Sequence, residues 1–487
     1  MSRRVLVPVL SIALFFSACR SRSGYQSSAD RYEPRAIPTG AVNVSGPLLS
    51  YADVVDRVAP AVVTIRSSQR VRAPQQFPFF DQPLFRQFFG RIAPPGGGTQ
   101  VEQSLGSGVI VRSDGHILTN HHVVDGAEQI RVDLSTHRTY SAKVVGSDPP
   151  SDLAVLKIDA GGLPVLQLGD SDKVRVGDVA LAVGNPLGVG ETVTAGIISA
   201  KGRATGLSNG SFQDFLQTDA PINKGNSGGA LVNTRGELVG INSQILSPSG
   251  GNIGIGFAIP SNMAKTVMDQ LIGKGKVQRG MIGVAVERVD GVIAEHYGLK
   301  EPRGIILNAI TPGGPGDKAG LKQGDIILQL NGKDVNDTNV FRNEIAATPP
   351  GTEVSLTVWR NNSQQQVRIR LGEWSEQSAE AKGAAGGGGG GEGSARLGIT
   401  VEPLTPDLTS QLGLPRGTQG VVINQVDPTG PAAEAGLQAG DVIQQVNRQP
   451  VRSVDDVRNA LQKSGNRPPL LLINRQGQTV FVPVPLR

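Results

Sequence analysis

Short apolar runs separated by glycines and polar turns recur along this chain, and the pattern predicts a mostly β protein. Residues 106–111 form an apolar run broken by glycines, and residues 115–124 follow closely enough to supply the second strand of a hairpin. Residues 153–158 and 241–245 predict two further strands. Residues 261–276 instead predict a short helix, because their apolar positions recur at near-helical spacing. These positions are Met263, Val267, Leu271 and Ile272.

The second half of the chain contains an internal repeat. Gly304 and Gly324 correspond to Gly420 and Gly440, and each pair is 116 residues apart. Two copies predict two small modules in tandem, because a solenoid needs at least three repeats. In both copies a Gly-Asp turn leads into an apolar strand, which resembles PDZ domains. The alternative interpretation is a pair of purely structural β modules.

Two short segments resemble the carboxylate-binding loops of PDZ domains. In such loops, backbone N–H groups capture the C-terminus of a peptide that adds as a strand to the sheet edge. The segments are Met281, Ile282, Gly283 and Val284 in the first copy, and Leu397, Gly398, Ile399 and Thr400 in the second.

Length and composition predict several domains joined by connectors. The chain has 487 residues, 64 of them glycine, which suggests three domains of ordinary size. An unbroken glycine run at residues 386–391 predicts a flexible tether before the last module. The expected boundaries are a signal peptide with a lipobox at 1–19, a flexible segment at 20–50, a larger β domain at 51–262, a helical linker at 263–278, a first PDZ domain at 279–374, a glycine-rich linker at 375–394 and a second PDZ domain at 395–487.

The start of the chain predicts export. Two arginines precede an apolar run at residues 5–16, and Ser17, Ala18 and Cys19 follow, which is the layout of a bacterial secretory signal. The run is shorter than the roughly 20 apolar residues that span a bilayer. Cys19 stands as in a lipobox, although Phe16 departs from the commoner leucine, so ordinary signal cleavage remains the alternative. We expect a periplasmic protein, anchored at a membrane surface if Cys19 is lipidated.

Charge and cysteine content narrow the expected partners. The formal net charge of +5 arises partly from arginines in and near the leader, so it predicts no nucleic-acid partner. The chain has one cysteine and therefore cannot form an internal disulfide.

Residues 225–229, Gly-Asn-Ser-Gly-Gly, contain a candidate nucleophile. Because Gly225 and Gly228 carry no Cβ, the backbone can turn sharply there. Such a turn can aim the N–H groups of Gly225, Asn226 and Ser227 at the point where an oxyanion develops. The Ser227 hydroxyl would attack from the same turn. Taken alone, the pentapeptide is equally well a tight surface turn.

A serine hydroxyl needs a base, and the usual base is a histidine held by a carboxylate. Among five histidines, His122 is expected at the end of the second strand of the predicted hairpin. Asp152 comes immediately before the apolar strand at 153–158, where it can be desolvated and orient an imidazole. The order His122, Asp152, Ser227 is that of chymotrypsin-type proteases, and it differs from the orders in subtilisins and α/β-hydrolases.

Each member of this set also has a structural interpretation. Adjacent His121 and His122 resemble metal ligands, but neighbours on a strand point to opposite faces and no further cluster completes a set. Asp152 follows two prolines and by itself is best explained as a turn residue. The three elements in one order along a β-like sequence favour the catalytic interpretation. No metal or organic cofactor is implied.

The segments around these residues resemble the HtrA (Deg) family of serine proteases. The matching segments are residues 119–124, 151–154 and 218–231, with further matches at 51–55, 60–63 and 251–260. His121 stands where several members carry asparagine. The likeness covers nearly all of the chain after the leader. It implies a chymotrypsin-like double β-barrel followed by two PDZ domains, and an ATP-independent endoprotease that degrades unfolded or misfolded polypeptides and recognises their C-termini.

The chymotrypsin-like arrangement also predicts the specificity pocket. The residue six before the nucleophile, Pro221, would lie at the base of the P1 pocket beside Ile222. Because neither supplies a carboxylate, the pocket would reject lysine and arginine. The expected pocket wall is the strand of Ile241, Asn242, Ser243, Gln244 and Ile245. We predict cleavage after valine, alanine, isoleucine or other small apolar residues.

A phenylalanine-rich segment at residues 77–89 suggests self-association, because such an apolar cluster is rarely left facing water. In the HtrA family the matching insertion packs against neighbouring subunits, which implies trimers or multiples of trimers. Two other functions compete with quality control. One is a PDZ-based chaperone or scaffold with a largely latent protease domain, and the other is a signalling protease that cuts a specific envelope partner.

Overall fold

The computed structural model describes residues 50–71, 100–185, 192–205, 212–223, 225–246, 252–375, 393–394, 397–415, 417–465 and 467–485. The predicted leader with Cys19, the phenylalanine-rich segment and the glycine run lie outside these residues. No helix in the described part of the chain is long and apolar enough to cross a membrane.

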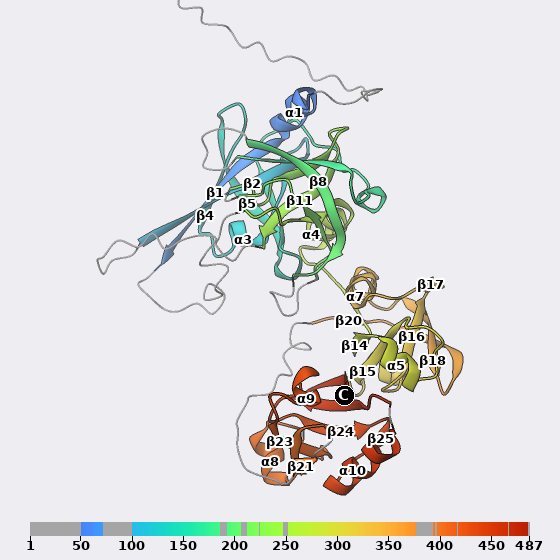
Figure 1. Cartoon of the computed structure of the whole chain (residues 1–487). Coiled ribbons are helices and arrows are strands. Elements are labelled where there is room, and N and C mark those ends of the chain that lie inside the picture. Colours follow the sequence, from blue (N-terminus) through green and yellow to red (C-terminus); the bar gives the residue numbers. More distant parts are fainter. Residues whose placement is uncertain are drawn as a thin grey trace, which may run out of the picture. The chain divides into compact units, whose positions relative to one another are not determined.

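The first strands close into a six-stranded antiparallel barrel with the order β1-β2-β3-β6-β5-β4 (Figure 1). Its strands are β1 (Val62–Val71), β2 (Gln100–Arg112), β3 (His116–Thr119), β4 (Gln129–Asp133), β5 (Thr139–Asp148) and β6 (Leu153–Ile158). Helix α1 (Ala52–Val58) and the 3-10 turn η1 (Ala59–Ala61) precede the barrel, and α3 (His121–Val124) and η2 (Pro149–Ser151) connect its strands.

A second six-stranded barrel follows, with the order β10-β11-β12-β9-β8-β7. Its strands are β7 (Val179–Gly184), β8 (Thr192–Arg203), β9 (Phe215–Thr218), β10 (Ala230–Asn233), β11 (Leu238–Ile245) and β12 (Gly256–Pro260). The 3-10 turn η3 (Ser171–Lys173) comes before it, and helix α4 (Ser261–Lys274) comes after it and ends at Gly275. The prediction of a mostly β protein with a double-barrel protease domain is confirmed.

Strand β6 is apolar except for Lys157, because its other side chains are buried. Leu156 and Ile158 belong to the core inside the first barrel. Val155 points the other way, into a cluster that draws residues from both barrels and from α4. Because both faces of this strand are largely buried, apolar residues follow one another along it, and only the partly exposed Lys157 interrupts the run. This shared cluster packs the two barrels and α4 against one another.

Two PDZ domains follow the barrels, as predicted. The first contains β13 (Gly280–Met281), β14 (Val284–Arg288), β15 (Ile305–Ile310), β16 (Ile326–Leu330), β17 (Lys333–Asp334), β18 (Glu353–Arg360), β19 (Ser363–Arg370) and β20 (Gly372–Glu373), with α5 (Gly291–His296), α6 (Pro315–Lys318) and α7 (Thr338–Ala347). The second contains β21 (Gly393–Ser394), β22 (Ile399–Pro403), β23 (Val421–Val426), β24 (Val442–Val446), β25 (Gln449–Pro450), β26 (Leu470–Arg475) and β27 (Gln478–Pro483), with α8 (Pro406–Gln411), α9 (Pro431–Glu434) and α10 (Val454–Lys463).

The internal repeat appears in the structure as the same ion pair, between an arginine and a buried aspartate, in both PDZ domains. In the first PDZ domain, Arg360 Nε lies 2.6 Å from Asp325 Oδ1. In the second, Arg475 Nε lies 2.7 Å from Asp441 Oδ1. Each arginine also donates to the carbonyl of a glycine that precedes its aspartate. The Gly-Asp turns that revealed the repeat therefore tie a loop to a strand in both domains.

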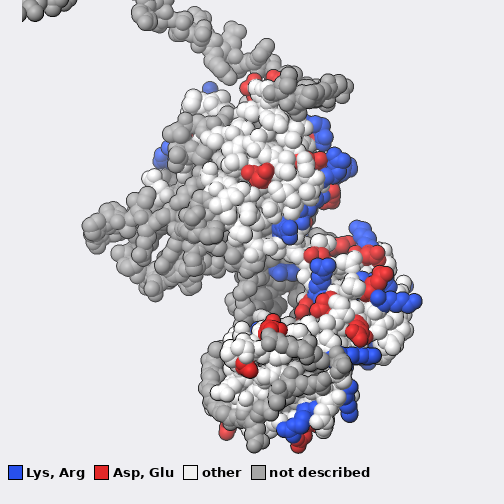
Figure 2. Space-filling model, in the orientation of Figure 1, with Lys and Arg blue, Asp and Glu red and all other residues white. Residues whose placement is uncertain are grey.

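On the face shown in Figure 2, the basic side chains of lysine and arginine are intermixed with the acidic side chains of aspartate and glutamate among the described residues.

Candidate active site

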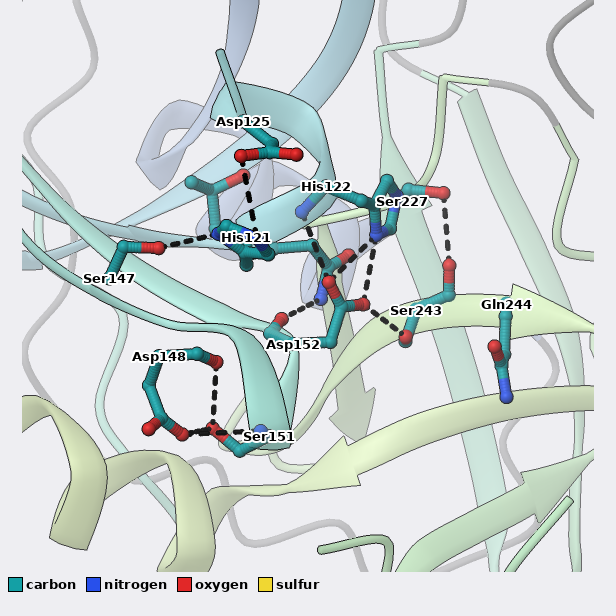
Figure 3. A network of polar contacts seen from close by, with 12 residues as sticks. His121, His122, Asp125, Ser147, Asp148, Ser151, Asp152, Ser227, Ser243 and Gln244 are labelled. Atoms are coloured by element: carbon teal, nitrogen blue, oxygen red, sulfur yellow. Dashed lines mark hydrogen bonds and ion pairs between the residues drawn. The ribbon is translucent and has the colours of Figure 1, made fainter. Parts of the chain in front are cut away.

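His122 lies on α3, one turn after β3, rather than at the end of a strand as predicted. The argument that His121 and His122 point apart as strand neighbours is therefore wrong in its reason. The two side chains nevertheless meet different partners, because successive positions on a helix also face different directions. His121 Nδ1 lies 2.6 Å from Ser147 Oγ, and its Nε2 lies 3.6 Å from Asp125 Oδ1 (Figure 3).

Asp152 holds the imidazole of His122. It follows η2 in the left-handed conformation, with φ of 56°, directly before β6. Both of its carboxylate oxygens lie 2.9 Å from His122 Nδ1, and Oδ1 also accepts the backbone N–H of His122 at 3.1 Å. These contacts fix the ring relative to the backbone of α3.

Ser243 adds a further bond to the carboxylate: its Oγ donates to Asp152 Oδ2 at 2.9 Å. Burial alone raises the pKa of Asp152, but the charge and hydrogen bonds of His122, together with the Ser243 hydroxyl, outweigh that effect. The pKa of Asp152 consequently lies below the usual range of an aspartate. The carboxylate is ionised at neutral pH and is an acceptor for a ring N–H.

Ser227 comes from the second barrel, on the turn before β10, and is 2 % exposed. Its Oγ donates to the carbonyl oxygen of Ser243 at 3.1 Å. Ser243 therefore contacts both Asp152 and Ser227, and Figure 3 shows His122 in the same polar network. Sequence reasoning placed Ser243 only in a pocket wall. Its position on β11, the second strand after Ser227, was the one available signal for its second role.

The nucleophile turn, residues 225–229, already uses one of the three N–H groups predicted to bind the oxyanion. The Asn226 N–H donates to Asn223 O at 3.0 Å, so it is not available to a substrate. Within the described residues, neither Gly225 N–H nor Ser227 N–H donates to a backbone carbonyl. Of the three predicted donors, Gly225 and Ser227 are thus the two whose N–H groups remain for an oxyanion.

The predicted pocket residues differ in their exposure. Pro221 is exposed, and its carbonyl accepts the Thr194 hydroxyl at 2.8 Å. Ile222 and Ile241 are fully buried, in the cores of the second barrel and of the shared cluster. The remaining residues on β11 are Asn242, Ser243, Gln244 and Ile245, and among these Gln244 is partly exposed.

The two predicted carboxylate loops have matching backbones. Gly283 and Gly398 have φ of 79° and 70°, in the left-handed region that favours glycine. The carbonyl of Gly283 accepts from Thr311 N at 2.8 Å, and that of Gly398 accepts from Asp427 N at 2.7 Å. Their outer edges differ. Strand β14 lies at the edge of its sheet, whereas β22 pairs with β21 at residues 399 and 400.

Comparisons with known proteins agree with this architecture. Residues 106–241 match the trypsin-like peptidase domain, and residues 280–371 and 422–475 each match the PDZ domain. A probable periplasmic serine endoprotease, DegP-like, from Chlamydia trachomatis is 38% identical over an alignment that covers 99% of this chain and 98% of the relative. The periplasmic pH-dependent serine endoprotease DegQ of Escherichia coli is 42% identical over 455 residues, which cover 91% and 93%.

Solved structures give the same result. The HtrA-type protease AlgW with a tripeptide is 44% identical, with a TM-score of 0.56, and the match covers 67% of this chain and 98% of that one. AlgW with a decapeptide is 46% identical, with a TM-score of 0.55 and coverage of 67% and 99%. Fold and site together define a chymotrypsin-type serine endopeptidase with two PDZ domains. The chain belongs to the HtrA family, which includes DegP and DegQ.

Proposed function

We propose that this protein is an ATP-independent endoprotease of the periplasm that degrades unfolded or misfolded polypeptides, with Ser227 as nucleophile, His122 as general base and Asp152 as its orienting carboxylate. The observation that carries the proposal is the convergence of the His122–Asp152 pair and Ser227 on Ser243, from two different barrels. The periplasmic setting is supported by the names of the relatives. Lipidation at Cys19 and assembly into trimers remain predictions.

The mechanism follows from the geometry. The Ser227 hydroxyl turns from the Ser243 carbonyl toward Nε2 of His122, which takes its proton while Oγ attacks the scissile carbonyl. Asp152 accepts a hydrogen bond from Nδ1–H of His122, which keeps that proton on Nδ1, and its negative charge stabilises the imidazolium that forms. The oxyanion accepts the N–H groups of Gly225 and Ser227. His122 then gives its proton to the leaving amine, and water releases the acyl group by the same steps.

We further propose cleavage after small apolar residues. No acidic side chain is among the predicted pocket residues, so a lysine or arginine would bury an unpaired charge there. Small apolar residues are accessible mainly in unfolded chains, which links the pocket to quality control.

A peptide library that varies only the residue before the scissile bond tests this specificity. We expect kcat/KM for valine, alanine and isoleucine to exceed that for arginine and lysine by about 100-fold or more, because desolvating an unpaired charge costs several kcal/mol. Matched digestion of a protein in its folded and reduced, unfolded forms should show loss of the unfolded form first. A preference for arginine would refute the assignment of the pocket.

Peptide C-termini are proposed to bind mainly at the first PDZ domain. An added peptide strand needs a free sheet edge. Strand β14 offers one, while the corresponding part of β22 is already paired with β21. The Gly283 loop lies directly before β14 and is where we expect the peptide carboxylate.

Binding of a fluorescent peptide with a free apolar C-terminus, to chains carrying Ser227→Ala, distinguishes the two loops. We expect Gly283→Val to weaken binding at least tenfold, because a β-branched residue is strained at positive φ and rebuilds the loop. The matched change Gly398→Val, at nearly the same φ, should alter affinity less than about twofold. An amidated peptide serves as the ligand control. Equal losses in both variants would contradict the assignment to the first domain.

A further inference from the structure

Ser107 lies on β2 at the point where the first barrel meets the nucleophile turn. The ladder between β2 and β3 ends at Val109 and Leu118, so Ser107 is not part of the backbone pairing between these two strands. The Ser107 N–H instead donates to Ser227 O at 2.8 Å, and its carbonyl accepts the Thr119 hydroxyl at 2.7 Å. Ser107 is fully buried.

The side chain of Ser107 is bonded on both sides. Its Oγ donates to the carbonyl of Gly225 at 2.5 Å and accepts the backbone N–H of Asn185 at 2.9 Å. A serine hydroxyl has a single proton to donate, and here that proton goes to the oxyanion turn. One residue of the first barrel thus holds the carbonyls of both Gly225 and Ser227.

These bonds determine where the Ser227 N–H points. That N–H shares a peptide unit with the carbonyl of Asn226, which accepts from Gly229 N at 2.9 Å. In a trans peptide the N–H and the carbonyl point in opposite directions, so the Ser227 N–H points away from Gly229. The peptide units on either side are held by Ser107, and the unit between them cannot rotate without breaking one of the three bonds.

Gly228 shows how closely the turn is seated on Ser107. Its φ is 81°, and a Cβ at this position would lie 2.2 Å from Ser107 O and 2.4 Å from Thr119 Oγ1. No side chain fits in that space. Contact between the turn and Ser107 is therefore direct, with backbone against backbone.

We propose that Ser107 is a positioning residue that holds the oxyanion turn of Gly225 and Ser227 in its reactive conformation. This inference rests on the proposed role of those two N–H groups. A pre-formed oxyanion hole accelerates the reaction because its donors need no rearrangement when charge develops. Loss of the Ser107 hydroxyl frees the Gly225 carbonyl and lets the turn relax, without touching the substrate or His122.

Steady-state kinetics on a peptide substrate test the proposal with the full chain carrying Ser107→Ala. We expect kcat to fall about 100-fold, comparable to the loss of one oxyanion donor, with KM within about twofold. The inhibition constant of a peptide boronic acid, which places an oxygen in the oxyanion hole, should rise by a similar factor. Binding of the uncleaved substrate to Ser227→Ala should not change when Ser107→Ala is added, because ground-state binding does not use the turn.

Ser261→Ala is the matched control. Ser261 is also fully buried, and its Oγ donates to a backbone carbonyl, that of Gly169, at 2.7 Å, outside the site. Both variants should lose similar thermal stability, but only Ser107→Ala should lose kcat. Ser107→Cys keeps the size and a weak donor, and an intermediate kcat is expected. It replaces the alanine variant if that variant does not fold.

The two variants test different claims: Ser107→Ala tests the positioning role of Ser107, and Ser227→Ala tests the nucleophile. If Ser107→Ala loses no more kcat than Ser261→Ala, or loses only KM, Ser107 is purely structural and the proposal is wrong. If Ser227→Ala retains the activity of the parent, the proposed nucleophile is wrong instead.

Discussion

Replacing Ser227 with alanine is expected to lower kcat by about a million-fold, with KM nearly unchanged, because removing a triad nucleophile leaves only binding and the oxyanion hole. The Ser227 side chain is 2 % exposed and its Oγ bonds only to a backbone carbonyl among the described contacts, so the fold should tolerate its loss. Single-turnover cleavage of a fluorogenic peptide, without nucleotide and with a chelator present, measures the effect.

Ser261→Ala again provides the comparison, since it removes a buried hydroxyl of the same kind outside the site. It should keep kcat within about threefold of the parent, as expected for a change that costs stability alone. Binding and the oxyanion hole alone should leave far less than about one per cent of the parent activity. Activity of Ser227→Ala above about one per cent would therefore exclude Ser227 as the nucleophile.

Replacing Asp152 with asparagine is expected to lower kcat about ten-thousand-fold at neutral pH, with little change in KM. Asp152 accepts from His122 Nδ1 and, through Oδ2, from the hydroxyl of Ser243. An asparagine of the same size presents one NH₂ group to these donors, so one contact becomes donor against donor. The imidazole then takes the wrong tautomer, with its proton on the nitrogen that must accept from Ser227.

The pH dependence separates Asp152 from other ionisable groups. The pKa of Asp152 is lowered, so the carboxylate stays charged above the ordinary aspartate value near 4, and its contribution is lost only as pH falls through the lowered pKa. Asp152 should therefore produce no change in kcat/KM between about pH 5 and pH 8. Asp125→Asn is the matched control, because Asp125 lies near His121 rather than His122. A loss of similar size in both variants would mean that general charge near α3, not the orientation of His122, supports the reaction.

Much of the site could be predicted because its candidate residues lie in short segments with recognisable local patterns. The glycines around Ser227 indicate a sharp turn whatever the surrounding fold. The apolar run after Asp152 indicates a buried strand and therefore a buried position for Asp152 beside it. The order of the three residues along the chain then selects one class of protease. The repeated Gly-Asp turns similarly revealed two modules, which the structure shows as two PDZ sheets with the same ion pair to a buried aspartate.

The errors and omissions have a common origin. His122 was expected on a strand, but the chain enters α3 after Asn120, and a four-residue helix is too short to show periodicity. Asn226 was counted as an oxyanion donor, but its N–H is used by Asn223 within the turn. Residue types signal neither the short helix at His122 nor the hydrogen bond of the Asn226 N–H, because the direction of the backbone depends on dihedral angles that many residues adopt.

The amino-acid sequence by itself determined the class of fold, the modular order and the candidates for the reacting side chains, because these depend on local turns, apolar periodicity and residue chemistry. Tertiary structure alone decided which groups surround them. Ser243 joins Asp152 to Ser227, and Ser107 holds the oxyanion turn from another barrel, over 100 residues away in sequence. Such contacts arise when two closed barrels pack through a shared core, and no local pattern encodes the partner that packing brings to a hydroxyl group.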